Sequence, residues 1–255
     1  MGPQFNHEKL HVYQHGLRFV AWTASVLVKI DRKAAVLDHL DRASESVVES
    51  IANGNSRRSA SDRNRYFDVA LGSGLECAAC LDICARKQLI SEEAQVDGKR
   101  MLQSIVRMIV GLRTADSPAV REKDEPYAID DTERPEHLFF HEKLDVYQRS
   151  LDVVGWLDSF LRETQLTARR GAGLDATTAS LVLNIAEGNG RYSSTDHRRF
   201  LDIAHTCAIN TTAAFDLLVA KGFVTAVQIV EGKRILAGVV PMLFGLRGYL
   251  DEQGS

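Results

Sequence analysis

Two histidines and a glutamate near the start of the chain have the spacing of a zinc-binding motif. His7, Glu8 and His11 form the pattern H-E-x-x-H. On a helix this pattern places two imidazoles one turn apart to bind zinc and a glutamate to activate water, as in a metalloprotease. The alternative is a solvated first helical turn. We favour it, because Asp145 replaces the second histidine in the second half of the chain and no third ligand follows at a familiar distance.

Three cysteines lie on one segment at a spacing that could also ligate a metal. Cys77, Cys80 and Cys84 occupy positions i, i+3 and i+7 of an expected helix. The same spacing is typical of a buried stripe, and a free buried cysteine behaves as a small apolar residue. The second half has a threonine, an alanine and a leucine at these places, so we expect core packing, no metal and no cofactor.

The densest shared polar feature is an arginine-rich connection that precedes the third expected helix of each half. Arginines beside a helix N-terminus can bind phosphate. The alternative is helix capping by Gly, Ser and Thr, with Asp62 and Asp196 favouring the helix dipole and diluting the positive charge. The candidate nucleic-acid-binding residues are Arg57, Arg58, Arg63, Arg65, Arg191, Arg198 and Arg199.

These features occur twice because the chain is one unit written twice. His7-Glu8-Lys9-Leu10 recurs as His141-Glu142-Lys143-Leu144, and Gly111-Leu112-Arg113 recurs as Gly245-Leu246-Arg247. All such pairs share an offset of about 134 positions, and roughly 40 of about 107 aligned positions are identical without a gap. A repeat of this length indicates a tandem duplication of a whole domain.

The spacing of apolar residues predicts four helices in each copy. In the first copy they span about 7–30, 34–52, 62–85 and 91–112, with Ser61 as the cap of the third. Thr195 and Thr225 mark the corresponding helix starts in the second copy. The fold class expected is all-α, with two tandem antiparallel up-and-down four-helix bundles.

The two bundles are expected at residues 1–114 and 137–255. Residues 115–136 contain three prolines among many acidic residues and predict an extended linker. The net charge of −3 divides into about +3 for the first bundle, −5 for the linker and −1 for the second. Charges interrupt every apolar run, and there is no apolar signal-like segment at the start, so we expect no membrane partner and a cytoplasmic location.

Both copies resemble the bacterial four-helix-bundle family of 23S rRNA intervening-sequence (S23) proteins, which includes the accessory variability determinant of diversity-generating retroelements. The likeness rests on Tyr13-Gln14, on Asn184-Ile185-Ala186-Glu187-Gly188-x-Gly190-Arg191-x-Ser193, and on Asp196 with Phe200-Leu201-x-Ile203-Ala204. The first copy departs from this pattern at Ser50, Asn53 and Ser56. The second copy has Thr206, Cys207 and Asn210 where the first keeps Gly72, Ser73 and Glu76. Each copy therefore keeps a different half of the pattern.

The resemblance implies a non-enzymatic bundle that assembles, binds a protein partner such as a reverse transcriptase, and contacts RNA or other nucleic acid. Because a fused pair supplies bundles in twos, we expect a homo-oligomer with an even number of bundles or an intramolecular pseudo-dimer. The first hypothesis is thus an oligomeric scaffold or adapter. The alternatives are a self-assembling structural bundle with no nucleic-acid role, which the sequence pI of about 6.2 favours, and an enzyme, which the lack of a catalytic constellation disfavours.

Overall fold

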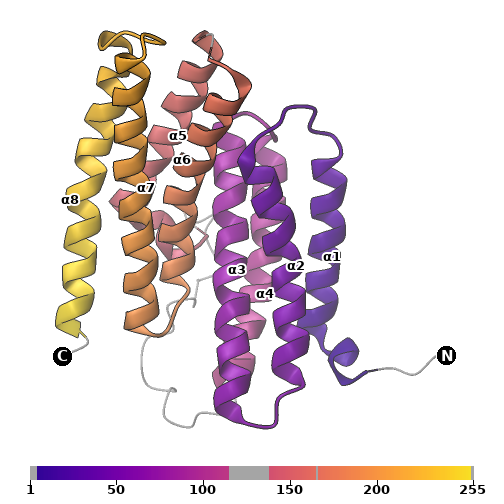
Figure 1. The fold of residues 1–255 in the computed structure, drawn as a ribbon. Helices are drawn as coiled ribbons and strands as arrows, with labels where there is room; N and C mark the ends of the chain where they lie inside the picture. The colour runs from indigo at the N-terminus through magenta and orange to yellow at the C-terminus, as the bar shows by residue number, and fades with distance from the viewer. Residues whose placement is uncertain (1–4, 115–137, 165, 254–255) are drawn as a thin grey trace.

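The structure, a computed structural model, describes residues 5–114, 138–164 and 166–253. Eight α-helices make up this part of the chain, and no strand occurs in it (Figure 1). They are α1 (His11–Leu27), α2 (Ala35–Asn55), α3 (Ala60–Arg86), α4 (Glu92–Thr114), α5 (Asp145–Glu163), α6 (Ala168–Asn189), α7 (Ser194–Ala220) and α8 (Val230–Gln253). Short 3-10 helices precede α1 (Asn6–Lys9), α5 (Phe140–Lys143) and α8 (Val227–Ile229).

The helices form the two four-helix bundles expected from the sequence. In the first bundle α1 and α3 each pack against both α2 and α4; in the second, α5 and α7 each pack against both α6 and α8. Residues one turn apart line the inner face of each helix, as Val12, Gly16, Phe19 and Thr23 do on α1. The expected linker at 115–136 lies outside the described residues.

The helix starts differ slightly from those expected. Ser59, not Ser61, caps α3, and its hydroxyl accepts a hydrogen bond from the backbone N–H of Asp62. Ser193 does the same for α7 through the N–H of Asp196, so the helix begins before Thr195. In both cases several Ser and Thr residues stand close together, and sequence alone does not choose among them.

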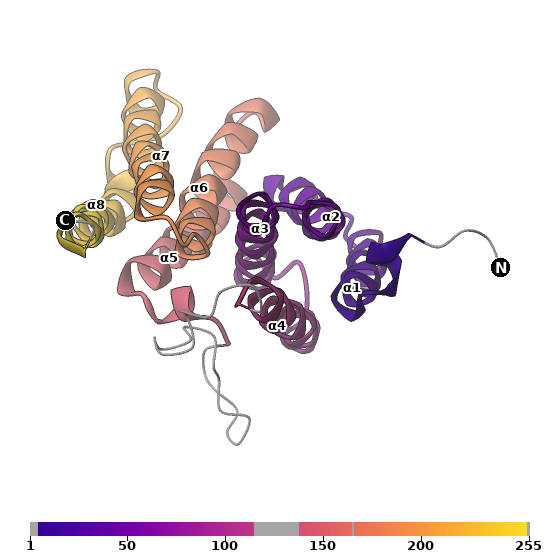
Figure 2. The ribbon, with the colours of Figure 1, turned by 90° about the horizontal axis from the view of Figure 1, so that it is seen from below.

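The two bundles pack side by side as one molecule. Figure 2 shows α3 and α6 facing each other at the centre, with α1 and α8 at opposite outer edges. α3 contacts both α6 and α5, and α2 contacts α6. We call this contact of α2 and α3 with α5 and α6 the inner interface. It buries α6 on two sides, because its own bundle covers one face and the first bundle covers the other.

α7 differs from α3, its counterpart, because no described part of the chain covers its outer side. Ile209 and Leu217 are 45% and 57% exposed, whereas their counterparts Leu75 and Ile83 are fully buried. Among the described helices, α7 is the one whose length and apolar content suffice to cross a membrane. Asp216 interrupts the apolar stretch of this helix, as expected from the sequence, and the absence of a membrane partner stays a prediction.

Candidate functional site

The arginine loop of the first bundle lies on the surface where α2 ends and α3 begins. Arg57 and Arg58 are exposed. The Arg57 guanidinium donates a hydrogen bond of 2.7 Å to the Tyr66 hydroxyl and lies 4.7 Å from the centre of that ring. Arg63 donates to the Arg57 carbonyl oxygen at 3.5 Å. The loop therefore presents its cations beside an aromatic ring and the first turn of a long helix.

A pocket of about 360 Å³ opens at this loop. It is lined by Arg57, Asp62, Arg65, Tyr66 and Val69. Guanidinium groups donate hydrogen bonds to phosphate oxygens, and a tyrosine ring can stack on a base, so this combination suits single-stranded nucleic acid. Asp62 is the acidic residue in the lining and reduces the positive potential there.

The second bundle uses its arginines differently. Arg191 pairs with Glu187, donates to the backbone oxygen of Asp68 at 3.3 Å, and packs its guanidinium against α3. Arg198 forms a 2.6 Å ion pair with Asp251, while Arg199 is exposed. Arg191 thus joins the two bundles. The seven candidate arginines do not share one role.

A buried polar cluster that the sequence analysis missed lies in the inner interface. The Lys99 ammonium on α4 is 2.6 Å from the Asp82 carboxylate on α3 and 2.7 Å from the Glu142 carboxylate, which precedes α5. The Tyr147 hydroxyl donates to Asp82 at 2.7 Å, and His141 packs edge-on against the Tyr147 ring. All five side chains are buried. The first bundle contributes two of them and the second contributes three.

The electrostatics of this cluster follow from burial around one central cation. Burial alone would lower the pKa of Lys99, but Asp82 and Glu142 raise it above its ordinary value. Burial raises the pKa of Glu142 more than Lys99 lowers it. His141 is fully buried, both ring nitrogens lack a hydrogen-bond partner, and its pKa falls to about 3. The histidine is therefore neutral at pH 7.

This cluster holds the one grouping of metal-ligating side chains found in the described residues. Asp82, His141 and Glu142 have ligand atoms within 4.8 Å of one another. The Lys99 ammonium already contacts both carboxylates and neutralises them. A divalent ion would have to displace a lysine with a raised pKa, so the residues present fit an ion pair better than a metal.

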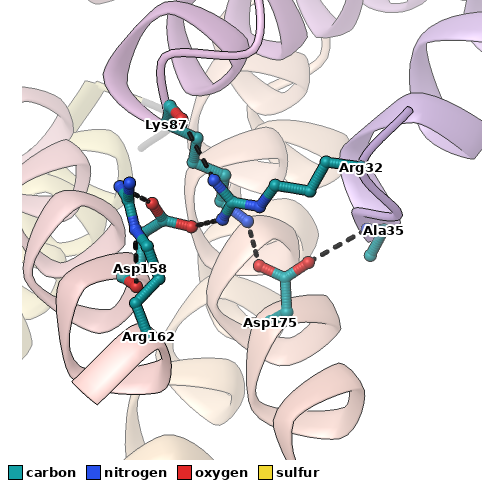
Figure 3. A network of polar contacts seen from close by, with 6 residues as sticks. All are labelled: Arg32, Ala35, Lys87, Asp158, Arg162 and Asp175. Atoms are coloured by element: carbon teal, nitrogen blue, oxygen red, sulfur yellow. Dashed lines mark hydrogen bonds and ion pairs between the residues drawn. The ribbon is translucent and has the colours of Figure 1, made fainter. Parts of the chain in front are cut away.

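A second set of charges joins the bundles near the start of α6. Figure 3 shows Asp175 on α6 between Lys87 and the backbone N–H of Ala35, with which it forms an ion pair and a 3.0 Å hydrogen bond. Asp158 on α5 pairs with both Arg32 and Arg162. Lys87 is 3% exposed. Two of these ion pairs, Lys87–Asp175 and Arg32–Asp158, join one bundle to the other.

The other two candidate motifs of the sequence have clear structural positions. His7 lies in a 3-10 helix and His11 begins α1, with the extended residue Leu10 between them. The two histidines therefore do not lie on one helical face, as zinc binding by H-E-x-x-H requires. Cys77, Cys80 and Cys84 are buried in the apolar core as expected, and burial raises their thiol pKa values.

One comparison with known proteins finds a match to the first bundle. No curated protein and no solved structure matches the chain significantly. Residues 8–111 match the family model of the 23S rRNA-intervening sequence protein. This range runs from the start of the first bundle almost to the end of α4. The match supports a 23S rRNA-intervening sequence-like helical protein, as the sequence resemblance implied.

Proposed function

We propose that the chain is a non-enzymatic scaffold or adapter in which two fused bundles form an intramolecular pseudo-dimer. It binds a protein partner and contacts RNA through the first bundle. The inner interface carries this proposal, because its buried ion pairs hold the bundles in one orientation without a second chain. The proposal places the protein in the cytoplasm, where its buried free thiols remain reduced.

The duplication and the link to retroelement accessory proteins are part of the proposal. The repeated sequence and the matching helix order of the two bundles support a tandem duplication. The retroelement link rests on the sequence resemblance, which implies a reverse transcriptase as the protein partner. Exposed apolar side chains on the second bundle supply a surface for such a partner; they include Ile209, Leu217, Phe223, Phe244 and Tyr249.

The RNA contact is proposed for the α2–α3 loop of the first bundle. Exposed Arg57 and Arg58, the pocket with Arg65 and Tyr66, and the about +3 charge of this bundle support it. Arg191 and Arg198 are engaged within the chain, so the second bundle contributes less. Phosphate contacts of this kind weaken steeply as the salt concentration rises, because the release of counterions then contributes less.

The test is fluorescence anisotropy with a labelled single-stranded RNA of mixed sequence at low and moderate salt. Arg57→Ala/Arg58→Ala should weaken binding several-fold and lower the salt slope by about 2, one for each phosphate contact removed. The matched control is Arg169→Ala/Arg170→Ala, an adjacent exposed pair at the start of α6 with the same charge change. Equal loss in both variants would reject the loop as the binding site.

The second candidate function is a structural scaffold with no nucleic-acid role. The ion pairs of Arg191 and Arg198 and the net charge of −3 favour it. It predicts no RNA binding even at low salt, where the adapter binds. The same titration therefore separates the two functions.

A further inference from the structure

The inner interface is asymmetric, because each bundle contributes a different surface to it. α6 presents one residue per turn toward the first bundle, and we call Asp175, Ala179, Leu183, Glu187 and Gly190 the α6 stripe. Its two ends are fixed by contacts. Asp175 pairs with Lys87 at the end of α3, and Gly190 packs against Gly72 in the middle of α3. α3 and α6 therefore run antiparallel, with Ala179 and Leu183 buried between these ends.

The corresponding stripe of the first bundle has different chemistry. On α2 the same positions form the α2 stripe: Asp41, Glu45, Glu49, Asn53 and Ser56. Two glutamates thus stand where α6 has the buried residues Ala179 and Leu183, and both glutamates are exposed. Burying an unpaired carboxylate in an apolar contact is strongly unfavourable. The α2 stripe is suited to water.

The receiving surface has also diverged between the copies. A Cβ atom at Gly190 would lie 3.1 Å from the Gly72 Cα, and one at Gly72 would lie 3.0 Å from the Arg191 guanidinium. The second bundle has Thr206 on α7 in place of Gly72, and the first has Ser56 in place of Gly190. Both positions of closest approach would then carry side chains. The middle of α7 therefore cannot receive α2 as α3 receives α6.

The charges of the inner interface are only partly repeated on the outer surfaces. In place of the Arg32–Asp158 pair, the outer surfaces have Leu166 for Arg32 and Ala24 for Asp158. In place of the Arg86–Asp152 pair, they have Ala220 for Arg86 and Arg18 for Asp152. Neither replacement can form an ion pair. Other interface residues are kept, but they have local partners. Glu8 accepts from the backbone N–H of Phe5, and Lys233 pairs with Asp216.

We propose that each bundle is specialised for one side of the contact, so that docking stops at two bundles. The first bundle only receives a helix, on α3, and the second bundle only supplies one, α6. The charged α2 stripe prevents the first bundle of a second copy from docking on the α7 face. A groove of about 670 Å³ between α6 and α7 then stays open toward such a copy. This explains why each copy keeps a different half of the family-like pattern. The proposal concerns contacts between copies and does not depend on RNA binding.

The experiment gives the α2 stripe the residues of the α6 stripe and gives α7 the glycine of α3, so that the two outer surfaces match the inner interface. The variant carries Glu45→Ala, Glu49→Leu, Asn53→Glu and Ser56→Gly on α2, with Thr206→Gly on α7. Light scattering during size-exclusion chromatography should give at least twice the 28.3 kDa mass of one chain for this variant. The matched control is Glu92→Ala/Glu93→Leu, which makes the same two glutamate substitutions at exposed positions at the start of α4. It should keep the wild-type mass.

A folded variant that keeps the wild-type mass would overturn the proposal, with circular dichroism and thermal unfolding as the check on folding. A second measurement is needed because the wild type could assemble through a different surface, which would raise its mass without α2–α7 docking. Ser56→Cys and Thr206→Cys would face each other between chains docked head to tail. We expect no interchain disulfide under mild oxidation. Efficient formation of that disulfide would also overturn the proposal, whatever the result of the RNA titration.

Discussion

At the scale of single residues, the same lysine has different surroundings in the two bundles. Lys99 is buried between Asp82 and Glu142, whereas its counterpart Lys233 pairs with Asp216 at a site where both side chains are more than one-third exposed. A buried charge depends on its partners, because removing one leaves another charge unpaired in a dry environment. Exposed pairs contribute little, since water and salt screen them.

Replacing Lys99 should therefore destabilise the protein far more than replacing Lys233. We expect Lys99→Met to lower the free energy of unfolding by about 3–5 kcal/mol, because Asp82 and Glu142 remain buried without their cation. Lys233→Met should cost no more than about 1 kcal/mol. Urea unfolding followed by circular dichroism measures both. Equal losses would mean that the Lys99 cluster is hydrated.

His141 makes the stability of the fold depend on pH. Its pKa is about 3 in the folded protein and 6.5 in the unfolded chain, so the unfolded chain binds the proton more readily between these values. The stabilisation by neutral His141 is complete above pH 6.5 and is lost progressively as the pH falls toward 3. The raised pKa of Glu142 acts in the opposite sense and reduces the net slope.

His141→Phe should remove this contribution while keeping the aromatic contacts with Phe139 and Tyr147. We expect the stability of the variant to fall less steeply than that of the wild type between pH 6.5 and 5. His7→Phe is the control, because His7 is partly exposed on the outer side of the first bundle. Parallel curves for the wild type and His141→Phe would contradict a buried neutral histidine.

Residue types predicted the core better than they predicted the charged contacts. The i, i+3, i+7 spacing placed Cys77, Cys80 and Cys84 correctly in the core. The role of Arg191 as a bridge between bundles and the meeting of Lys99 with Glu142 were missed. Helical periodicity reports which face of a helix is buried, but it does not report which other bundle will cover it. The one sequence signal that pointed to the buried cluster was the repeated His-Glu-Lys-Leu segment, whose second copy supplies His141 and Glu142.

At the scale of helices, the closest approach in the inner interface depends on glycine. A Cβ at Gly190 would lie 3.1 Å from the Cα and 3.2 Å from the N of Gly72. These are backbone atoms, so a side chain at Gly190 would require α3 and α6 to move apart. Gly173 lies near the start of the same helix, and a Cβ there would have no neighbouring atom within 4 Å.

Alanine should therefore have opposite effects at these two glycines of the second bundle. Gly190→Ala should lower the free energy of unfolding by about 1–3 kcal/mol through overpacking. Gly173→Ala should raise it by about 0.5–1 kcal/mol, because alanine favours a helix where space is free. Thermal and urea unfolding of the two variants measure the difference. A stabilising Gly190→Ala would show that the helices are not in close contact there.

At the scale of the whole molecule, sequence predicted two bundles but not how they meet. Apolar periodicity located the four helices of the first bundle to within a few residues, and the repeat offset extended them to the second bundle, because both signals are local. The start expected at Thr225 precedes that of α8 at Val230. The inner interface joins α3 and α6, whose contacting residues lie far apart in the sequence. The acidic stretch between the bundles predicted a linker and left their packing open, whereas buried Lys87, Asp158 and Tyr147 are each satisfied by the opposite bundle.

The central claim is that the two bundles form one docked unit, and a double-mutant cycle across the inner interface tests it most directly. Lys87→Met, Asp175→Asn and the double variant are compared with the wild type by urea unfolding. Docked bundles predict a coupling free energy of about 1–3 kcal/mol between the two positions, because the ion pair is largely buried. Changes that add within about 0.5 kcal/mol would contradict the docked arrangement.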